Sequence, residues 1–213
     1  MTARINTILI DIPQCLTMLN EQGWAVTQDS NYEDIIYINS HRGSLEKSEA
    51  FIKGYITFMD KASMLVARLV NPQPGERILD CCAAPGGKSM YMATLMDNVG
   101  SLMSCDIHEH KIELMNSNAD RLGASIVHTK VQDATKLPDS WNSYFDRVLV
   151  DAPCSGLGIL QKKLDMRWRK QESILSELPP LQLAILERAA MTVKEKGYLI
   201  YSTCTLNYKE NEE

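Results

Sequence analysis

The stretch that decides the fold is Glu76–Ser89, which reads ERILDCCAAPGGKS. Ile78–Cys81 is an apolar run with one acid, a turn of small residues follows it, and Lys88 opens an amphipathic segment. This pattern predicts a buried strand, a tight loop and the start of a helix. In an open α/β sheet, ligands bind beyond the carboxyl ends of the strands, where Gly-rich backbone exposes N–H groups. The candidate floor of a nucleotide-type cofactor site is therefore Cys82, Ala83, Ala84, Pro85, Gly86, Gly87 and Lys88.

Two familiar phosphate-binding loops are excluded by the residues themselves. A P-loop needs glycine where Cys82 stands, and the dinucleotide fingerprint G-x-G-x-x-G is absent. Two interpretations remain at this point, a different kind of nucleotide-type site and a simple tight turn between a strand and a helix.

The periodicity on either side of this stretch alternates between strand and helix. We expect strands at 77–81, 101–106, 126–132, 147–151 and 198–203, and helices at 88–96, 109–122 and 178–194. Such alternation implies parallel βαβ units with right-handed crossovers, and hence an α/β fold with a doubly wound, mostly parallel sheet.

The residues before Glu76 predict a smaller attachment. Extended runs at 5–10 and 35–38 flank a helix at 13–22, which gives a small α+β satellite over residues 1–45. Apolar positions at helical spacing then predict a helical connector over 46–75, and the main domain covers 76–213.

Acidic residues punctuate the ends of the predicted strands. Asp80, Asp106, Asp133 and Asp151 each lie in or directly after one of the first four strands of the main domain. Asp106 follows Gly86 by 20 positions, a spacing at which a carboxylate can accept both hydroxyls of a ribose. Each acid alone could merely cap a helix, but four at consecutive strand ends indicate a site.

Two cysteines follow predicted strands in the segments Asp151-Ala-Pro-Cys154-Ser-Gly and Ser202-Thr-Cys204-Thr. If those strands are neighbours, both sulfurs converge on the crevice beside Asp151. A thiol has an ordinary pKa of about 8.5, so a nucleophilic cysteine needs help, for which Lys88 or a substrate charge is available. The alternative is that both are inert core residues. The six cysteines show no C-x-x-C pair, so we expect free thiols and no zinc.

The charge balance gives mixed evidence on partners. A net charge of −5 is untypical of nucleic-acid-binding proteins, but the segment 161–170, QKKLDMRWRK, is locally basic. Its cations and one aromatic ring suit an RNA backbone and a stacked base, although a solvated helix face is the plainer interpretation: Lys162, Lys163, Arg167, Trp168, Arg169 and Lys170. No apolar run spans a membrane and no signal peptide is evident, so a cytoplasmic location is expected.

Three segments carry a resemblance to a known family. Cys82–Lys88 (CAAPGGK), Phe145–Gly156 (FDRVLVDAPCSG) and Tyr201–Thr205 (YSTCT) resemble motifs I, IV and VI of the RsmB/NOP2/Sun family of RNA cytosine-5 methyltransferases, in the family's order. The resemblance starts at Arg4–Asn6. It implies a Rossmann-like class I methyltransferase fold, S-adenosyl-L-methionine as cofactor and RNA as substrate, with small-subunit (16S) ribosomal RNA the expected target.

The resemblance also implies roles for individual residues. It assigns the methyl donor to the loop Cys82–Lys88, its ribose to Asp106, its adenine region to Asp133 and the methyl-transfer edge to Asp151. In this family the cysteine matching Cys204 is the nucleophile that adds to carbon 6 of cytosine. The cysteine matching Cys154 assists product release.

The chain also departs from the family pattern. The family's sheet has seven strands, and the last two are missing here, so we expect a fragment of doubtful turnover whose strand at 198–203 is an unprotected apolar edge. Two alternatives stay open. One is a DNA-type cytosine-5 methyltransferase with Cys154 as nucleophile, and the other is a module that binds cofactor and RNA without catalysis.

Overall fold

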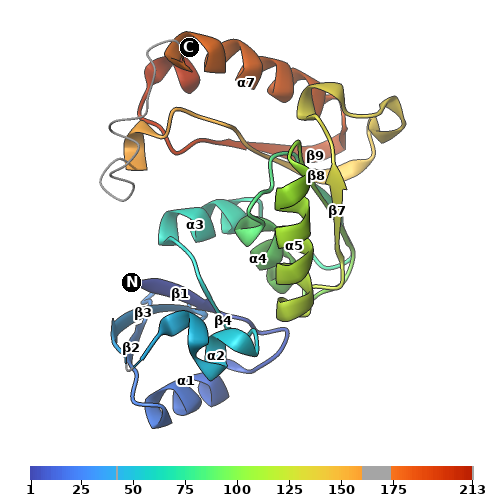
Figure 1. Ribbon diagram of the computed structural model, residues 1–213. Helices are drawn as coiled ribbons and strands as arrows, with labels where there is room; N and C mark the ends of the chain where they lie inside the picture. Colours follow the sequence, from blue (N-terminus) through green and yellow to red (C-terminus); the bar gives the residue numbers. More distant parts are fainter. Residues whose placement is uncertain (42, 160–173, 213) are drawn as a thin grey trace.

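The computed structural model describes residues 1–41, 43–159 and 174–212, and contains two β-sheets (Figure 1). A four-stranded antiparallel sheet has the order β2-β3-β1-β4, built from β1 (Thr2–Ile5), β2 (Ala25–Gln28), β3 (Ile35–Ser40) and β4 (Ile56–Phe58). A five-stranded parallel sheet has the order β7-β6-β5-β8-β9, built from β5 (Arg77–Asp80), β6 (Ser101–Asp106), β7 (Val127–Val131), β8 (Phe145–Asp151) and β9 (Val193–Ser202).

The N-terminal sheet packs against two helices, α1 (Ile12–Glu21) and α2 (Glu49–Ile52). Two expectations about this part are wrong. The first strand is Thr2–Ile5 and not 5–10, because Asp11 caps α1 and the intervening residues form turns. The segment 46–75 is not a continuous helix, because β4 lies within it and pairs with β1, so the N-terminal sheet reaches Phe58.

The parallel sheet has the five predicted strands and three predicted helices: α4 (Gly87–Leu95), α5 (Glu109–Leu122) and α7 (Ile174–Ala190). The main difference lies at the last helix, which ends at Ala190 and not at 194. Val193 already pairs with Phe145 of β8, so the edge strand β9 begins five residues earlier than its apolar run suggested.

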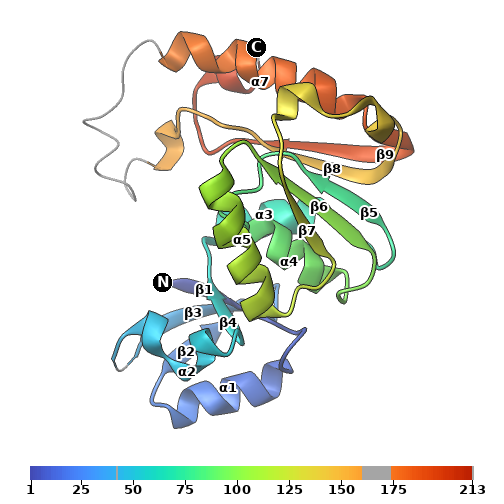
Figure 2. The ribbon, with the colours of Figure 1, turned by 45° about the vertical axis from the view of Figure 1, so that its right-hand side comes forward.

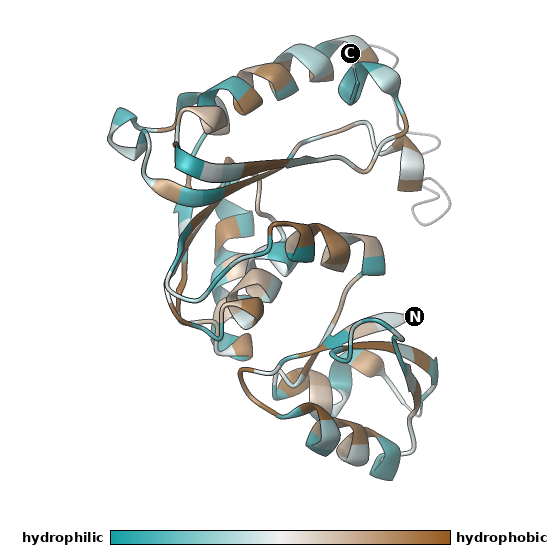
Figure 3. Ribbon diagram, turned by 180° about the vertical axis from the view of Figure 1, so that it is seen from behind, coloured by the Kyte–Doolittle hydropathy of each residue, from teal (hydrophilic) through white to brown (hydrophobic). Residues whose placement is uncertain are grey.

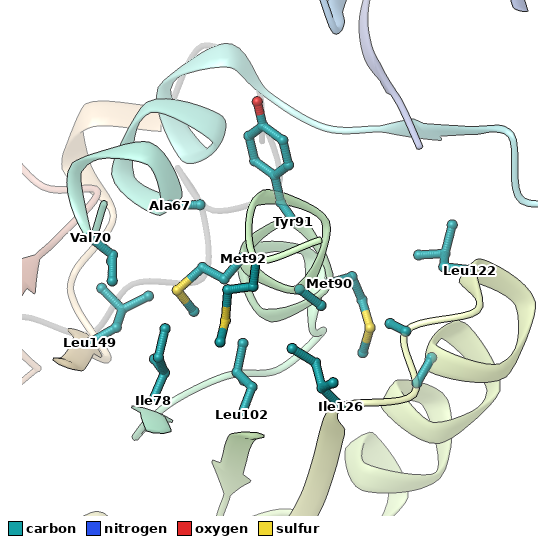
Figure 4. Packing of buried hydrophobic residues seen from close by; sticks show 14 of the residues in the cluster. Ala67, Val70, Ile78, Met90, Tyr91, Met92, Leu102, Leu122, Ile126 and Leu149 are labelled. Atoms are coloured by element: carbon teal, nitrogen blue, oxygen red, sulfur yellow. The ribbon is translucent and has the colours of Figure 1, made fainter. Parts of the chain in front are cut away.

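Helices cover both faces of the parallel sheet (Figure 2). In β5, Ile78 packs with α4 and with α3 (Lys61–Leu69), whereas its neighbour Leu79 packs on the opposite face with Ile185 of α7. Figure 4 shows the first of these clusters, in which the methionines Met90 and Met92 of α4 lie against the strands. Because both faces are covered at the centre of the sheet, β5 and β8 each contain a buried apolar run, whereas the edge strands β7 and β9 carry polar and charged residues as well. Figure 3 shows hydrophobic stretches along the sheet with hydrophilic residues among them.

A buried polar network joins the N-terminal sheet to the main domain. Arg68 of α3 pairs with Asp34 and donates to the Tyr91 hydroxyl at 2.7 Å, and that hydroxyl donates to Asp34 at 2.6 Å. Arg4 of β1 is fully buried, lies over the Tyr91 ring and donates to Thr94 at 3.1 Å. These contacts hold the small sheet against α3 and α4.

Three-residue 3₁₀ turns complete the described chain: η1 (Leu45–Lys47), η2 (Ala134–Lys136), η3 (Asp139–Trp141), η4 (Leu157–Ile159) and η5 (Tyr208–Glu210). Within the described ranges, every helix is too short or too polar to span a membrane.

Candidate active site

The carboxyl ends of β5, β6 and β8 place three of the predicted acids along one edge of the sheet. Asp80 ends β5 beneath the glycine-containing loop, Asp106 ends β6 and Asp151 ends β8. The pairings β5–β6 and β5–β8 are parallel, so these ends point the same way. The three acids therefore lie at the same edge of the sheet, as the sequence suggested.

Asp80 is the most deeply buried of these acids. Its side chain accepts a hydrogen bond from the Ser89 hydroxyl at 2.7 Å, and its other oxygen has no partner among the described residues. Burial raises the pKa of this carboxyl to about 7, with the negative charge of Asp151 adding to the effect and the Ser89 bond opposing it.

The loop before α4 offers backbone donors to a nucleotide-type ligand. Gly86 is the N-cap of α4 in the left-handed conformation, with φ of +96°, and a Cβ there would come within 3.1 Å of Met115. The first-turn N–H groups of a helix have no partners within it and favour electron-rich ligand atoms. The residues Cys82–Lys88 thus fit the cofactor that the sequence implies.

Asp106 is placed to complete such a site. One carboxylate oxygen accepts the backbone N–H of His108 at 3.0 Å and lies 3.7 Å from Lys111 Nζ. The second oxygen makes no hydrogen bond within the described part of the chain. The free oxygen of this strand-end carboxylate is available to a ribose hydroxyl, and the ribose assignment stays a prediction.

Asp133 lies after β7 and caps the turn η2. It accepts the Thr135 backbone N–H at 2.9 Å and the Thr135 hydroxyl at 2.7 Å, and these bonds lower the pKa of its carboxyl. Both of these bonds are the bonds of a capping residue. The assignment of Asp133 to the adenine region stays a prediction.

Both oxygens of Asp151 are engaged. Lys88 donates to one oxygen at 2.5 Å and the Ser202 hydroxyl donates to the other at 2.7 Å, so one carboxylate ties the cofactor loop to the end of β9. The suggestion that Lys88 would assist a cysteine is not supported, because its ammonium group pairs with Asp151. The sequence alone indicates no role for Ser202. The pairing of β8 with β9 places Ser202 beside Asp151, where its hydroxyl holds the carboxylate.

The two candidate cysteines meet, because β8 and β9 are neighbours. The Sγ atoms of Cys154 and Cys204 lie 3.1 Å apart in hydrogen-bond contact, and the backbone N–H of Cys204 donates to Cys154 Sγ at 3.2 Å. Cys204 is exposed, whereas Cys154 is half-buried. The thiol that an incoming base can reach first is therefore Cys204.

The same contact makes the two thiols chemically unequal. The hydrogen bond from the Cys204 thiol, helped by the backbone N–H groups of Cys204 and Gly156, lowers the pKa of Cys154 to about 6, against the opposing effects of burial and of Glu210. The bond to Cys154 raises the pKa of Cys204. The backbone N–H of Cys204 points at Cys154 Sγ, so this arrangement favours the negative charge on Cys154 and the proton on Cys204.

Of the other four cysteines, Cys15, Cys81 and Cys105 are buried core residues, and Cys82 of the cofactor loop is partly buried. Burial raises the pKa of every one of these thiols, to about 12 for Cys15 and Cys105. Cys154 is thus the only cysteine of the six whose pKa is lowered.

Glu210 supports the site and was missed by sequence reasoning. Its buried carboxylate accepts the backbone N–H of Ser155 at 2.7 Å, Gln182 Nε2 at 3.0 Å and Asn207 Nδ2 at 2.9 Å. In the sequence it lies in a polar, charged segment that reads as solvent-exposed, so no local signal marked it.

The basic segment proposed to contact RNA lies outside the described residues, with all six of its side chains: Lys162, Lys163, Arg167, Trp168, Arg169 and Lys170. Over the described ranges, no group of three or more His, Cys, Asp or Glu side chains is arranged to hold a metal ion.

Comparisons with known proteins show what this chain is similar to. The family model for the 16S rRNA methyltransferase RsmB/F matches residues 67–213. A Bacillus subtilis (strain 168) protein, "Probable ribosomal RNA small subunit methyltransferase B", is 41% identical over 213 residues, which is 100% of this chain and 47% of that protein. Human tRNA (cytosine(72)-C(5))-methyltransferase NSUN6 is 36% identical over 181 residues, covering 78% of this chain and 37% of its own length.

Among solved structures, a methyltransferase homolog protein from Pyrococcus horikoshii superimposes with a TM-score of 0.88 at 29% identity, covering 99% of this chain and 66% of its own. The chain spans about half the length of the curated relatives it matches, 47% in the Bacillus subtilis case. Because the family model covers well over half of the chain, this protein belongs to the 16S rRNA methyltransferase RsmB/F family.

Proposed function

We propose that this chain forms the catalytic core of an enzyme that transfers a methyl group from S-adenosyl-L-methionine to carbon 5 of a cytosine in RNA. The observation that carries the proposal is the Cys154–Cys204 contact of 3.1 Å beside the Asp151 carboxylate, at the sheet edge that also holds the cofactor loop. The names of the relatives, which specify ribosomal RNA and tRNA, support RNA as the substrate, and the family supports small-subunit ribosomal RNA as the target.

The chemistry needs a nucleophile because carbon 5 of cytosine is a poor one by itself. Cys204 Sγ adds to carbon 6, and the proton of its thiol passes to the Cys154 thiolate 3.1 Å away. In the adduct, the ring nitrogen N3 takes a proton from water and returns it when the adduct breaks down, and Asp151 stabilises the protonated nitrogen. S-adenosyl-L-methionine supplies the methyl group that carbon 5 then takes. Removal of the carbon-5 proton requires a base, and Cys154 is available for this after it has lost its proton to water.

The inequality of the two thiols supports this division of roles. A thiolate stabilised by backbone donors is a weaker nucleophile than one of high pKa, but it is a competent base near neutral pH. Cys204 has the raised pKa and the exposed position that suit the nucleophile. Cys154 has the lowered pKa that suits the base.

The lowered pKa of Cys154 also keeps one alternative open, the DNA-type arrangement in which Cys154 itself attacks carbon 6. A trapping experiment separates the two. The protein is mixed with S-adenosyl-L-methionine and small-subunit ribosomal RNA carrying 5-fluorocytosine, and any covalent adduct is located by mass spectrometry.

Fluorine cannot leave as a proton, so the intermediate stalls on the thiol that attacked. We expect the adduct on Cys204. An adduct on Cys154 would establish the DNA-type arrangement instead, and the absence of any adduct would favour a module that binds cofactor and RNA without catalysis.

Contact of RNA with residues 1–45 and with the basic segment 161–170 belongs to the same proposal, supported by the cations of that segment.

A further inference from the structure

Glu210 is a buried carboxylate that pairs with no cation among the residues that the structure describes. It is 3% exposed, and none of the Lys or Arg side chains in the described ranges forms an ion pair with it. Burial opposes its ionisation, but the bonds from Ser155, Asn207 and Gln182 outweigh that effect and hold its pKa below the ordinary value. Retaining a buried charge in this way is costly unless hydrogen bonds satisfy it, so its partners deserve a functional explanation.

Those partners come from both cysteine-bearing segments. Ser155 directly follows Cys154 and donates its backbone N–H to Glu210 Oε2, and Asn207 follows Cys204 by three residues and donates to Oε1. Gln182 of α7 donates to the same Oε2 and also to the carbonyl of Pro153, at 2.8 Å. The residues on either side of Cys154 are therefore both held, one by Glu210 directly and one through Gln182.

Further bonds close the same unit. The Ser155 and Thr205 hydroxyls are 2.7 Å apart, and the Gly158 N–H donates to the carbonyl of Cys204 at 3.0 Å. The Tyr201 hydroxyl, from the end of β9, donates to the backbone carbonyl of Glu210 at 3.0 Å. Glu210 lies at the centre of these links, yet it contacts neither thiol.

We propose that Glu210 is a positioning residue that clamps the Cys154 segment to the Cys204 segment, so that Cys154 Sγ stays on the backbone N–H of Cys204 and within reach of the Cys204 thiol. Glu210 thus acts on the Cys154 segment although it lies 55 residues after Ser155 in the chain. Its catalytic importance rests on the proposed function, but its effect on the thiols does not, because it can be measured without RNA or cofactor.

The electrostatic and positional effects of Glu210 have opposite signs, which makes the proposal testable. Its negative charge alone raises the pKa of Cys154, so deleting the charge would lower that pKa. Loss of the clamp would separate Cys154 Sγ from its donors and raise the pKa toward the ordinary value of about 8.5. The direction of the change tells which effect dominates.

The experiment measures the rate of alkylation by iodoacetamide against pH, with Cys154 and Cys204 distinguished by mass spectrometry of their separate peptides. Glu210→Ala is expected to raise the midpoint for Cys154 and to slow its alkylation at pH 7 roughly tenfold or more. Glu210→Gln keeps an oxygen that can accept from Ser155 and Gln182, and we expect it to stay closer to the wild type. Glu212→Ala removes an exposed carboxylate two residues away and should change nothing.

A lowered or unchanged midpoint in Glu210→Ala would overturn the proposal. If that variant does not fold, as judged by circular dichroism, Glu210→Asp replaces it, because it keeps the charge but is one methylene too short to reach Ser155. An unchanged midpoint in Glu210→Asp would equally overturn the clamp. Failure of RNA methylation in the wild type would count against the proposed function and would leave the thiol result standing.

Discussion

Replacing Asp80 with Asn should stabilise the protein by an amount that depends on pH. Asp80 is 1% exposed, one of its oxygens has no partner among the described residues, and burial raises the pKa of its carboxyl to about 7. The ordinary value for an aspartate is about 3.9. An Asn side chain can still accept the Ser89 hydrogen bond, and it carries no charge at any pH.

The magnitude follows from the two pKa values. Between pH 4 and pH 7 the folded protein binds the Asp80 proton more tightly than the unfolded chain does, so the free energy of unfolding falls as pH rises through this window. The cost of the carboxyl is about 1.5 kcal/mol at pH 5 and about 4 kcal/mol at pH 8. The stability advantage of Asp80→Asn over the wild type should therefore be larger at pH 8 than at pH 5, by roughly 2.5 kcal/mol.

Urea unfolding of the wild type and of Asp80→Asn at pH 5 and pH 8 measures this directly, because other titrating groups cancel in the difference between the two proteins. Asp97→Asn removes an exposed carboxylate and serves as the control. If the difference between Asp80→Asn and the wild type is the same at both pH values, Asp80 is not a carboxyl of raised pKa in the folded state, and the reasoning fails.

Three further predictions concern the cofactor site and the joint between the two sheets. Asp106→Ala should weaken S-adenosyl-L-methionine binding by about tenfold or more in calorimetry, since a charge-assisted contact to the ribose would be lost; a normal affinity would refute the ribose assignment. Arg68→Met should lower the free energy of unfolding by about 3 kcal/mol in urea, because it leaves a buried carboxylate uncompensated; a neutral result would mean that the network joining the sheets contributes little. Gly54→Ala should be destabilising by about 2 kcal/mol or more, since a Cβ there would lie 2.1 Å from the Arg121 carbonyl oxygen; Gly43→Ala, with a similar positive φ but open space around it, should cost less in the same assay.

The centre of the parallel sheet could be predicted from the sequence because its strands are buried on both faces. Segments such as Val148–Val150 read as unbroken apolar runs, and Gly- or acid-containing turns bound them. The strand β4 could not be found in the same way. It is only three residues long, and its apolar residues fall in step with the helical spacing of the helices on either side, so only its pairing with β1 identifies it.

The acids at the edge of the candidate site could also be predicted, since the direction of parallel strands fixes where their ends lie. The partners within the site could not. The sequence suggested that Lys88 assists a cysteine, but Lys88 pairs with Asp151. Glu210, from a polar segment near residue 210, contacts the Cys154 segment through Ser155. Both outcomes depend on which loops meet in three dimensions, and one sequence carries no local signal for that.

The short contact between the two sulfurs explains why this reaction benefits from two cysteines. In the proposed reaction, attack requires the Cys204 proton to leave, and release requires Cys204 to depart from carbon 6 as a thiol. A thiol of high pKa is a strong nucleophile once deprotonated but a poor leaving group, so it needs a proton donor at the last step. Cys154, 3.1 Å away, can accept the Cys204 proton during attack and then lose it to water. After it has taken the carbon-5 proton, it can hand that proton to the departing Cys204 sulfur. This returns both thiols to their starting states, with the negative charge on Cys154.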